Sequence, residues 1–258
     1  MIMAHLKRYS MPGFWPLARK AESYVTTPVP GPHPKYSCIP LRVLLRDSLK
    51  AVETADEARR ILNAGKVLVD KKIRKHPGFP VGLMDVIEVP DLHARYRVNM
   101  GKRGLVLEKI KDEETSYKLC RITGKSTVKG GMLQFSLHDG RTVLSKEPYM
   151  VGDSLMIGLP HQDVLKHFSL RKGEACLILA GRNMGATGKI KAMKESKSML
   201  EKGTVTIETE KGKDIETLRS YVMVGSYEGE IPKPREHVEK PKVGRKRHET
   251  PSGKESKA

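Results

Sequence analysis

The chain has few cysteines and few aromatic residues, and it contains no long hydrophobic run. Only Cys38, Cys120 and Cys176 occur among its 258 residues, and they lie far apart. An odd number without a C-x-x-C pair argues against a disulfide framework or a cysteine-based zinc site. The nine histidines form no H-E-x-x-H motif. We therefore interpret the cysteines as small buried apolar residues and expect neither a metal nor a cofactor.

Hydrophobic segments are short throughout. The longest, Ala175 to Ala180, has six residues, whereas a membrane-spanning helix needs roughly 20. The N-terminal residues contain no apolar block of signal-peptide length. These absences predict a protein that stays inside the cell, and we expect it in the cytoplasm.

Acidic residues are also few in comparison with basic ones. The chain has 30 of them against 48 lysines and arginines, so its formal charge is +18. A charge of this size repels itself in a compact fold unless a polyanion neutralises it. Nucleic acid is the first candidate partner and an anionic membrane surface the second. A basic protein without such a partner is the third alternative.

Residues 1–40 are basic and rich in proline, with six prolines between Pro12 and Pro34. Proline breaks helices and removes ladder donors, so the pattern predicts an extended basic N-terminal arm. We expect this arm to be disordered in the free protein and to become ordered on a large partner, the alternative being a floppy terminus. Its candidate RNA-binding residues are His5, Lys7, Arg8, Trp15, Arg19 and Lys20.

Residues 41–91 predict two helices followed by a basic hairpin and a closing strand. The first helix, over residues 41–52, has its leucines on one face. Thr54 with Glu57 forms a capping box that begins the second helix, and Gly65 ends it. The candidate RNA-binding residues here are Arg42, Arg46, Lys50, Arg59, Arg60, Lys66, Lys71, Lys72, Arg74 and Lys75. The alternative is a solvated basic face.

The order of these elements resembles the small RNA-binding module named after bacterial ribosomal protein S-four. The matching residues are Ala58-Arg59, Ile61, Gly65-Lys66-Val67, Val69-Asp70, Lys72 and Asp85-Val86-Ile87. The usual Ser-Arg pair that opens the second helix is replaced by Thr54-Ala55, so one arginine contact of the module is missing.

Residues 92–170 alternate like strands and predict a central all-β domain, a sandwich or a small barrel. Asp139-Gly140 between apolar runs indicates a hairpin. The tetrapeptide Gly124 to Thr127 looks like the end of a phosphate-binding loop, but the expected upstream glycine is Leu119 and no helix can follow Gly130-Gly131. We interpret Gly124-Lys125 as a turn between strands and exclude nucleotide hydrolysis.

Residues 171–225 predict a strand, a glycine-rich turn and a further strand. Gly181, Gly185 and Gly188, like Gly65 earlier, are candidate structural glycines that allow positive φ and close backbone approach. The segment resembles the KOW motif, which implies a small SH3-like barrel, with Arg182, Asn183 and Lys189 as candidate RNA contacts. Residues 226–258 predict a basic, flexible tail.

Taken together, the arm, the S-four-type module, the β unit containing "LHDGRT" and the KOW segment resemble the small-subunit ribosomal protein S-four-e family, and its archaeal members most. The resemblance implies an α+β multidomain structural constituent of the small ribosomal subunit, without enzymatic activity. It implies that the partners are small-subunit ribosomal RNA and neighbouring ribosomal proteins. The alternatives are a KOW-containing transcription factor and an RNA-modifying enzyme such as a pseudouridine synthase.

Overall fold

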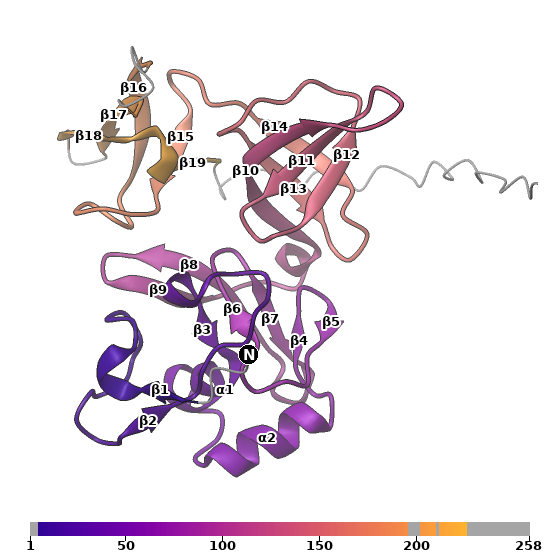
Figure 1. Ribbon diagram of the computed structural model, residues 1–258, viewed down its shortest axis with the longest axis vertical. Helices are drawn as coiled ribbons and strands as arrows, with labels where there is room; N and C mark the ends of the chain where they lie inside the picture. The colour runs from indigo at the N-terminus through magenta and orange to yellow at the C-terminus, as the bar shows by residue number, and fades with distance from the viewer. Residues whose placement is uncertain (1–4, 196–201, 210–211, 226–258) are drawn as a thin grey trace, which may run out of the picture.

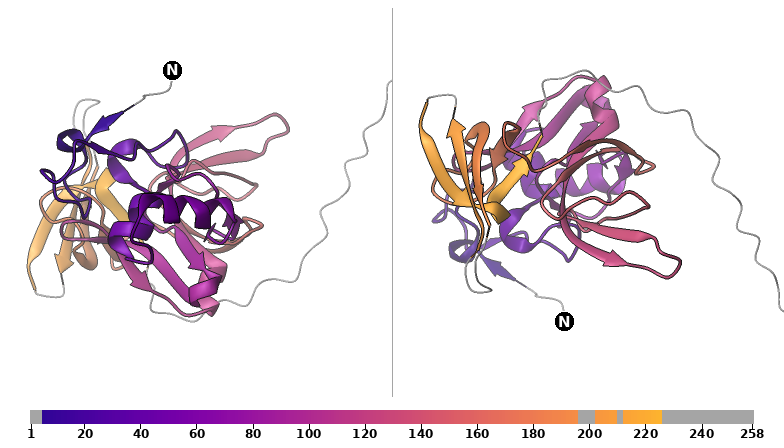
Figure 2. Two further views of the ribbon diagram at one scale, coloured as in Figure 1. Left: turned by 90° about the horizontal axis from the view of Figure 1, so that it is seen from below. Right: turned by 90° about the horizontal axis from the view of Figure 1, so that it is seen from above.

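The computed structural model describes residues 5–195, 202–209 and 212–225. These residues form three five-stranded antiparallel sheets and two short two-stranded ones. Figure 1 shows the first sheet and the helices in the lower part of the molecule, with two β units above them. Seen from above, the two β units stand side by side (Figure 2). No helix among the described residues is long and apolar enough to cross a membrane.

The lower unit, residues 5–109, contains both helices and a sheet of order β5-β4-β7-β8-β9. Its strands are β1 (Leu6–Lys7), β2 (Tyr24–Val25), β3 (Ile39–Pro40), β4 (Leu68–Val69), β5 (Lys72–Ile73), β6 (Pro80–Val81), β7 (Val86–Val89), β8 (Ala94–Gly101) and β9 (Gly104–Lys109). The pairs β1–β2 and β3–β6 form the two small sheets. Short 3-10 turns lie at Arg8–Ser10, Lys35–Ser37 and Pro90–Leu92.

The N-terminal arm packs on its own module, so the prediction of an unpacked arm is wrong. Trp15 is 3% exposed, and its Nε1 donates to the carbonyl of Cys38 at 2.8 Å. Leu6 and Met11 join it in the same core as the helices. The prolines do keep the arm largely out of regular structure. Its apolar side chains Leu6, Met11 and Trp15 are nevertheless buried against other residues of the same chain.

The predicted module of residues 41–91 contains two helical segments. The first is α1 (Leu41–Val43) continued by a π-helical turn, Leu44–Ser48. It is shorter than the predicted 41–52, and Lys50 follows it with a φ of 52°. The predicted basic stripe of Arg42, Arg46 and Lys50 is therefore not one continuous helical face.

The second helix, α2 (Ala55–Asn63), confirms its predicted start and end. Thr54 and Glu57 form the capping box. Gly65 has a φ of +76°, and its N–H donates to the carbonyl of Leu62 at 3.0 Å.

Strands β4 and β5 form the predicted basic hairpin, whose turn at Asp70 and Lys71 has φ values of 52° and 62°. Strands β8 and β9 then extend the same sheet, because β7 pairs with β8 and β8 with β9. Sequence reasoning placed residues 92–109 in the central domain. The pairing assigns them to the lower sheet, since β8 follows β7 after a short turn and takes its open edge.

The central sheet has the order β12-β11-β10-β13-β14. Its strands are β10 (Tyr117–Thr127), β11 (Leu133–Leu137), β12 (Thr142–Ser145), β13 (Ser154–Gly158) and β14 (Val164–Phe168), after a 3-10 turn at Glu113–Ser116. Asp139-Gly140 makes the predicted hairpin between β11 and β12. Gly124 to Thr127 lie within β10, paired with β11. They are strand residues and not the predicted turn, because the register continues across them after a bulge at Ile122/Gly124.

The C-terminal sheet has the order β18-β17-β16-β15-β19. Its strands are β15 (Ala175–Ile178), β16 (Thr187–Lys194), β17 (Thr204–Thr209), β18 (Asp214–Leu218) and β19 (Val222–Val224), with a 3-10 turn at Arg219–Tyr221. Gly181 and Gly185 have φ values of 94° and 78°, as the prediction of positive φ requires. Gly188 permits close approach instead, because a Cβ there would lie 2.3 Å from the carbonyl oxygen of Glu208.

Each of the three units has its own hydrophobic core, and a fourth cluster joins them. Leu83 and Met84 of the lower unit meet Leu119 of β10 and Leu177 and Met223 of the C-terminal sheet. The three sheets are thereby fixed to one another by apolar contacts as well as by the chain.

Candidate nucleic-acid interface

A basic hollow lies on the lower unit where α1, α2 and the segment after β5 meet. Its volume is about 430 Å³, and it is lined by Arg42, Arg59, Asn63, Lys75, His76 and Pro77. The N–H of Arg42 donates to the carbonyl of Pro77 at 2.9 Å, which holds α1 against this segment. The hydrogen bond from the Gly78 N–H to His76 Nδ1, at 3.1 Å, orders the turn that follows.

A second, larger hollow of about 1080 Å³ continues along the proline-rich segment. It is lined by residues 25–35 together with His5, Tyr24, Arg42 and His76. Arg42 and His76 line both hollows, so we treat the two as one surface and call it the basic groove. The rings of His5 and Tyr24 lie 5.2 Å apart at its edge. In single-stranded nucleic acids, unpaired bases stack on aromatic rings and the phosphates bind cations, so this surface offers groups of both kinds.

The described lining of the groove includes the cations Lys35, Arg42, Arg59 and Lys75 and contains no carboxylate. Burial and the neighbouring Arg46 lower the pKa of Arg42, against the opposing effect of Asp56, Glu22 and Asp47. A guanidinium nevertheless remains charged in proteins. Arg42 is therefore a fixed cation in a partly dehydrated position, where it binds an anion more strongly than a fully solvated charge does.

The predicted RNA-binding residues separate into three groups. His5, Arg42, Arg59 and Lys75 come together in the basic groove. A second group is exposed elsewhere and forms no ion pair within the described part of the chain: Lys7, Arg19, Lys20, Lys50, Arg60, Lys72, Arg182, Asn183 and Lys189.

The third group already has partners inside the protein. Arg8 pairs with Glu22 at 2.8 Å, Arg46 with Asp47 at 3.1 Å, Lys66 with Asp91 at 2.6 Å and Lys71 with Glu88 at 2.9 Å. Arg74 lies over the ring of Phe79, with Cζ 4.4 Å from its centroid. Trp15 is buried, so its assignment as an RNA contact is wrong. Arg8 is also buried, which argues against its prediction as an RNA-binding residue.

Sequence reasoning missed several lining residues, among them Asn63, His76, Tyr24 and Lys35. His76 could have been found, because it stands in a turn, "HPG", directly after the basic hairpin. Tyr24 and Lys35 carry no local signal, since their place follows from how the arm folds back.

The most deeply buried charges lie elsewhere, between the lower unit and the central sheet. Lys118 of β10 is 1% exposed. Its Nζ lies 2.5 Å from Asp85 Oδ1 and 3.0 Å from both Asp70 Oδ2 and Asp139 Oδ2. Arg141 also reaches Asp70, at 2.5 Å. Burial alone lowers the pKa of Lys118, but Asp85 and Asp70 outweigh it and raise that pKa well above its ordinary value.

His138 borders this ion cluster in its neutral form. The N–H of Arg121 donates to Nδ1, so the ring proton resides on Nε2, which donates to the carbonyl of Leu83 at 3.2 Å. Burial, with Lys118 nearby, lowers the pKa of His138 to about 4. Cys120, His138 and Asp139 have donor atoms within 4.8 Å of one another. Those atoms are already used, because Asp139 binds Lys118 and burial raises the pKa of the Cys120 thiol.

The three cysteines are buried and unpaired, which confirms their interpretation as apolar residues. Burial raises the pKa of Cys38 to about 12 and that of Cys176 to about 11. Thiols with such pKa values are poor nucleophiles at neutral pH.

Comparison with protein families gives three matches along the chain. Residues 3–36 match the RS4NT (NUC023) domain, residues 40–87 the S4 domain and residues 93–164 the ribosomal family S4e. The basic groove is built from the first two of these segments.

Curated relatives extend the similarity over most of the chain. The small ribosomal subunit protein eS4 of Methanothermobacter thermautotrophicus is 42% identical over 221 residues, covering 85% of this chain and 91% of the relative. That of Archaeoglobus fulgidus is 40% identical over 224 residues, covering 87% and 94%. The crystal structure of the 30S ribosomal protein S4e from Thermoplasma acidophilum superimposes with a TM-score of 0.63 at 30% identity, covering 73% of this chain and 94% of that one. On these matches, the chain belongs to the ribosomal S4e family.

Proposed function

We propose that this protein is a structural constituent of the small ribosomal subunit and binds the ribosomal RNA of that subunit through basic surfaces. The observation that carries the binding site is the basic groove, where Arg42, Arg59 and Lys75 converge without a carboxylate in the described lining. The protein has no catalytic role in this function. As part of the ribosome it acts in the cytoplasm, where neighbouring ribosomal proteins are its further partners.

Binding follows from charge and shape. Lysine and arginine neutralise phosphates and release the counterions condensed on RNA. The deep, narrow groove of an RNA helix hides base edges, so recognition depends on backbone shape and on unpaired nucleotides. The His5–Tyr24 pair offers a stacking surface for such a nucleotide beside the cations.

The C-terminal sheet supplies a second basic element. Its β15–β16 turn presents Arg182 and Asn183 to solvent, and positive φ at Gly181 and Gly185 shapes that turn. We propose that residues 171–225 are a KOW-type, SH3-like barrel whose turn contacts RNA. The predicted basic tail, residues 226–258, lies outside the described residues.

The test is a salt titration of binding to full-length small-subunit ribosomal RNA. Arg42, Arg59 and Lys75 are changed together to Gln, which removes three charges from the groove. Each lost phosphate contact flattens the slope of log affinity against log salt by roughly 0.7 to 0.9, so we expect a change of about 2 to 3.

The control is a triple variant with the same change in charge, Arg46→Gln, Lys66→Gln and Lys191→Gln. Each of these cations is paired with a carboxylate in the free protein, so we expect a much smaller change in slope. Equal slopes for the two variants would show that net charge alone determines binding and that the groove is not the site.

A further inference from the structure

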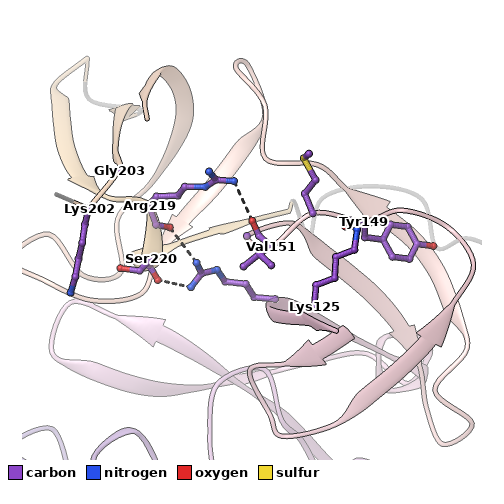
Figure 3. Close-up of a pocket in the computed structure, with 10 residues that line it drawn as sticks. Lys125, Tyr149, Val151, Lys202, Gly203, Arg219 and Ser220 are labelled. Atoms are coloured by element: carbon purple, nitrogen blue, oxygen red, sulfur yellow. Dashed lines mark hydrogen bonds between the residues drawn. The ribbon is translucent and has the colours of Figure 1, made fainter. Parts of the chain in front are cut away.

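A second positively charged hollow lies between the central and C-terminal sheets, away from the basic groove. Its volume is about 590 Å³. It is lined by Arg121, Lys125, Tyr149, Met150, Val151, Gly152, Lys202, Gly203, Arg219 and Ser220. Figure 3 shows Lys202 and Lys125 on opposite sides of the hollow, with Arg219 and Ser220 between them. None of these residues was singled out from the sequence for RNA binding.

Two arginines hold the sheets together at this place. Arg121 Nη1 donates to the carbonyl of Ser220 at 2.5 Å, and Nη2 donates to that of Arg219 at 3.3 Å. In return, Arg219 Nη2 donates to the carbonyl of Val151 at 3.2 Å. These hydrogen bonds position the guanidinium groups but do not neutralise them, because a backbone carbonyl carries no net charge.

The hollow therefore has four cations and, among the described residues that line it, no carboxylate. Burial lowers the pKa of Arg121, and the nearby positive charge of Arg219 lowers it further. Lys125 Nζ donates to the carbonyl of Tyr149 at 3.4 Å and lies 5.7 Å from the centroid of the Phe135 ring. Neither contact neutralises its charge, and within the described residues neither Lys125 nor Lys202 pairs with a carboxylate. An arrangement of this kind is stabilised when an anion enters it.

The rim of the hollow is apolar and exposed. Met150 is 69% exposed and Val151 is 43% exposed, although both stand beside the cations. The two residues are consecutive in the chain and together present apolar surface beside the cations. Phosphate-binding cations next to an apolar rim match an unpaired nucleotide, whose phosphate is anionic and whose base has apolar faces. The volume of the hollow falls within the range of about 300 to 1,000 Å³ typical of sites for small ligands.

We propose that this hollow is a separate binding site for an unpaired segment of RNA. Lys125, Lys202 and Arg219 take the phosphates, and a base packs on Met150 and Val151. The inference rests on the proposed function, in that it names a second contact for the same RNA partner. It differs in requiring unpaired nucleotides, whereas the cations of the basic groove can also hold a helix backbone.

The experiment uses the full chain and a fluorescein-labelled oligouridine, with an RNA duplex of equal length for comparison. In the pocket variant, Lys125→Gln and Lys202→Gln, the two arginines that join the sheets are kept. Loss of two phosphate contacts flattens the salt slope for single strands by about 1.4, which corresponds to roughly tenfold weaker binding near physiological salt. The control, Lys109→Gln with Lys111→Gln, removes two exposed charges elsewhere, and its slope stays close to the parent value.

Met150→Ser tests the base contact separately. It removes apolar surface and no charge, so oligouridine binding weakens about fivefold while the salt slope is unchanged. Binding of the duplex is unaffected, because a paired base cannot enter the hollow. Photocrosslinking of an oligomer that contains 4-thiouridine places the adduct in the peptide with Tyr149, Met150 and Val151.

Several outcomes would overturn the proposal. One is that the pocket variant and the control have the same slope, with no crosslink at residues 149–151. Another is that the parent binds a deca-glutamate peptide and the pocket variant does not, while both proteins bind RNA equally well. That result would assign the hollow to an acidic protein partner. In both cases the parent still binds RNA, and changing Arg42, Arg59 and Lys75 to Gln still weakens that binding, so the proposed function stands. Failure of the parent to bind RNA would instead remove both proposals.

Discussion

At the scale of single residues, Lys118 is a fully buried cation that three aspartates share. It lies among three carboxylates in a position without solvent, and no local sequence pattern marks it. A buried ion pair contributes little net stability compared with apolar residues, but removing one partner leaves the other charges uncompensated. Lys118 therefore matters chiefly because three aspartates depend on it.

We expect Lys118→Ala to lower the free energy of unfolding by about 3 to 5 kcal/mol, since it leaves buried carboxylates unpaired. Urea denaturation followed by circular dichroism measures this. Lys109→Ala, at an exposed strand position, serves as the control and should change stability by less than about 0.5 kcal/mol. A Lys118 variant as stable as the control would mean that the cluster rearranges or admits water.

His138 makes stability depend on pH. Its folded-state pKa is about 4, against an ordinary value of 6.5, so the unfolded chain binds more protons between these two values. Stability then rises with pH across this window, is fully present above about 6.5 and is lost as the pH falls toward 4. Lys118, Asp139 and His33 face the ring and share in the effect.

The measurement compares thermal unfolding of the parent and His138→Gln from about pH 4 to pH 7. Carboxylates contribute to both curves, so the difference isolates the imidazole. We expect the parent curve to be steeper. Parallel curves would contradict a neutral His138 in the folded protein.

At the scale of elements, two glycines of the turn between β15 and β16 differ in how closely other residues pack against them. Gly181 and Gly185 both have positive φ. A Cβ at Gly181 would meet only the Tyr221 ring, at 3.7 Å, whereas at Gly185 it would lie 2.5 Å from the carbonyl carbon of Gly101. Gly185 is thus where the C-terminal sheet rests on the β8–β9 hairpin.

We expect Gly181→Ala to cost about 1 kcal/mol through backbone strain alone. Gly185→Ala should cost clearly more, because it adds a backbone clash across two units. Melting temperatures of the two variants test the order. Gly130→Ala, at a positive φ with nothing near its Cβ, is the strain-only control. An equal loss at all three positions would contradict the contact at Gly185.

The elements that sequence predicted correctly are those with local rules. The Thr54–Glu57 capping box, the end of α2 before Gly65 and the Asp139-Gly140 hairpin are each decided within a few residues. The burial of Trp15 was missed because it depends on a carbonyl 23 residues away. Asp70 and Lys118 are separated by 48 residues, so their pairing has no local signal either.

The candidate site was predictable only in part for the same reason. Composition indicates a basic surface, and two of the residues predicted from the hairpin and α2, Arg59 and Lys75, line the basic groove. Which cations face a partner depends on which carboxylates lie nearby in the fold. Lys66 and Asp91 are 25 residues apart, and only the folded chain brings them to 2.6 Å.

At the scale of the whole molecule, the charge of +18 dominates. Ion pairs in the described part neutralise some cations, but the excess remains and repels itself across the surface. Salt screens such repulsion over distances of about 10 Å at 0.1 M. The same salt weakens binding to a polyanion.

We therefore expect the melting temperature of the free protein to rise as potassium chloride increases from about 0.02 to 0.3 M, because screening relieves self-repulsion. Scanning calorimetry without RNA measures it. Changing Lys20, Lys50 and Lys72 to Glu removes three positive charges and adds three negative ones. The net charge falls by six from +18, which should reduce the rise. A melting temperature that falls with salt in both proteins would show that the surface ion pairs outweigh the excess charge.

The buried ion cluster also has a consequence for the order of events during synthesis. Asp70 and Asp85 leave the translating ribosome well before Lys118, and Arg141 comes later still. Until then Asp85 has His33 beside it, at 3.1 Å, but neither aspartate has the lysine or arginine with which it pairs in the described structure. We therefore expect the packing of the lower unit to be completed only after β10 has been synthesised and has placed Lys118 beside the two aspartates.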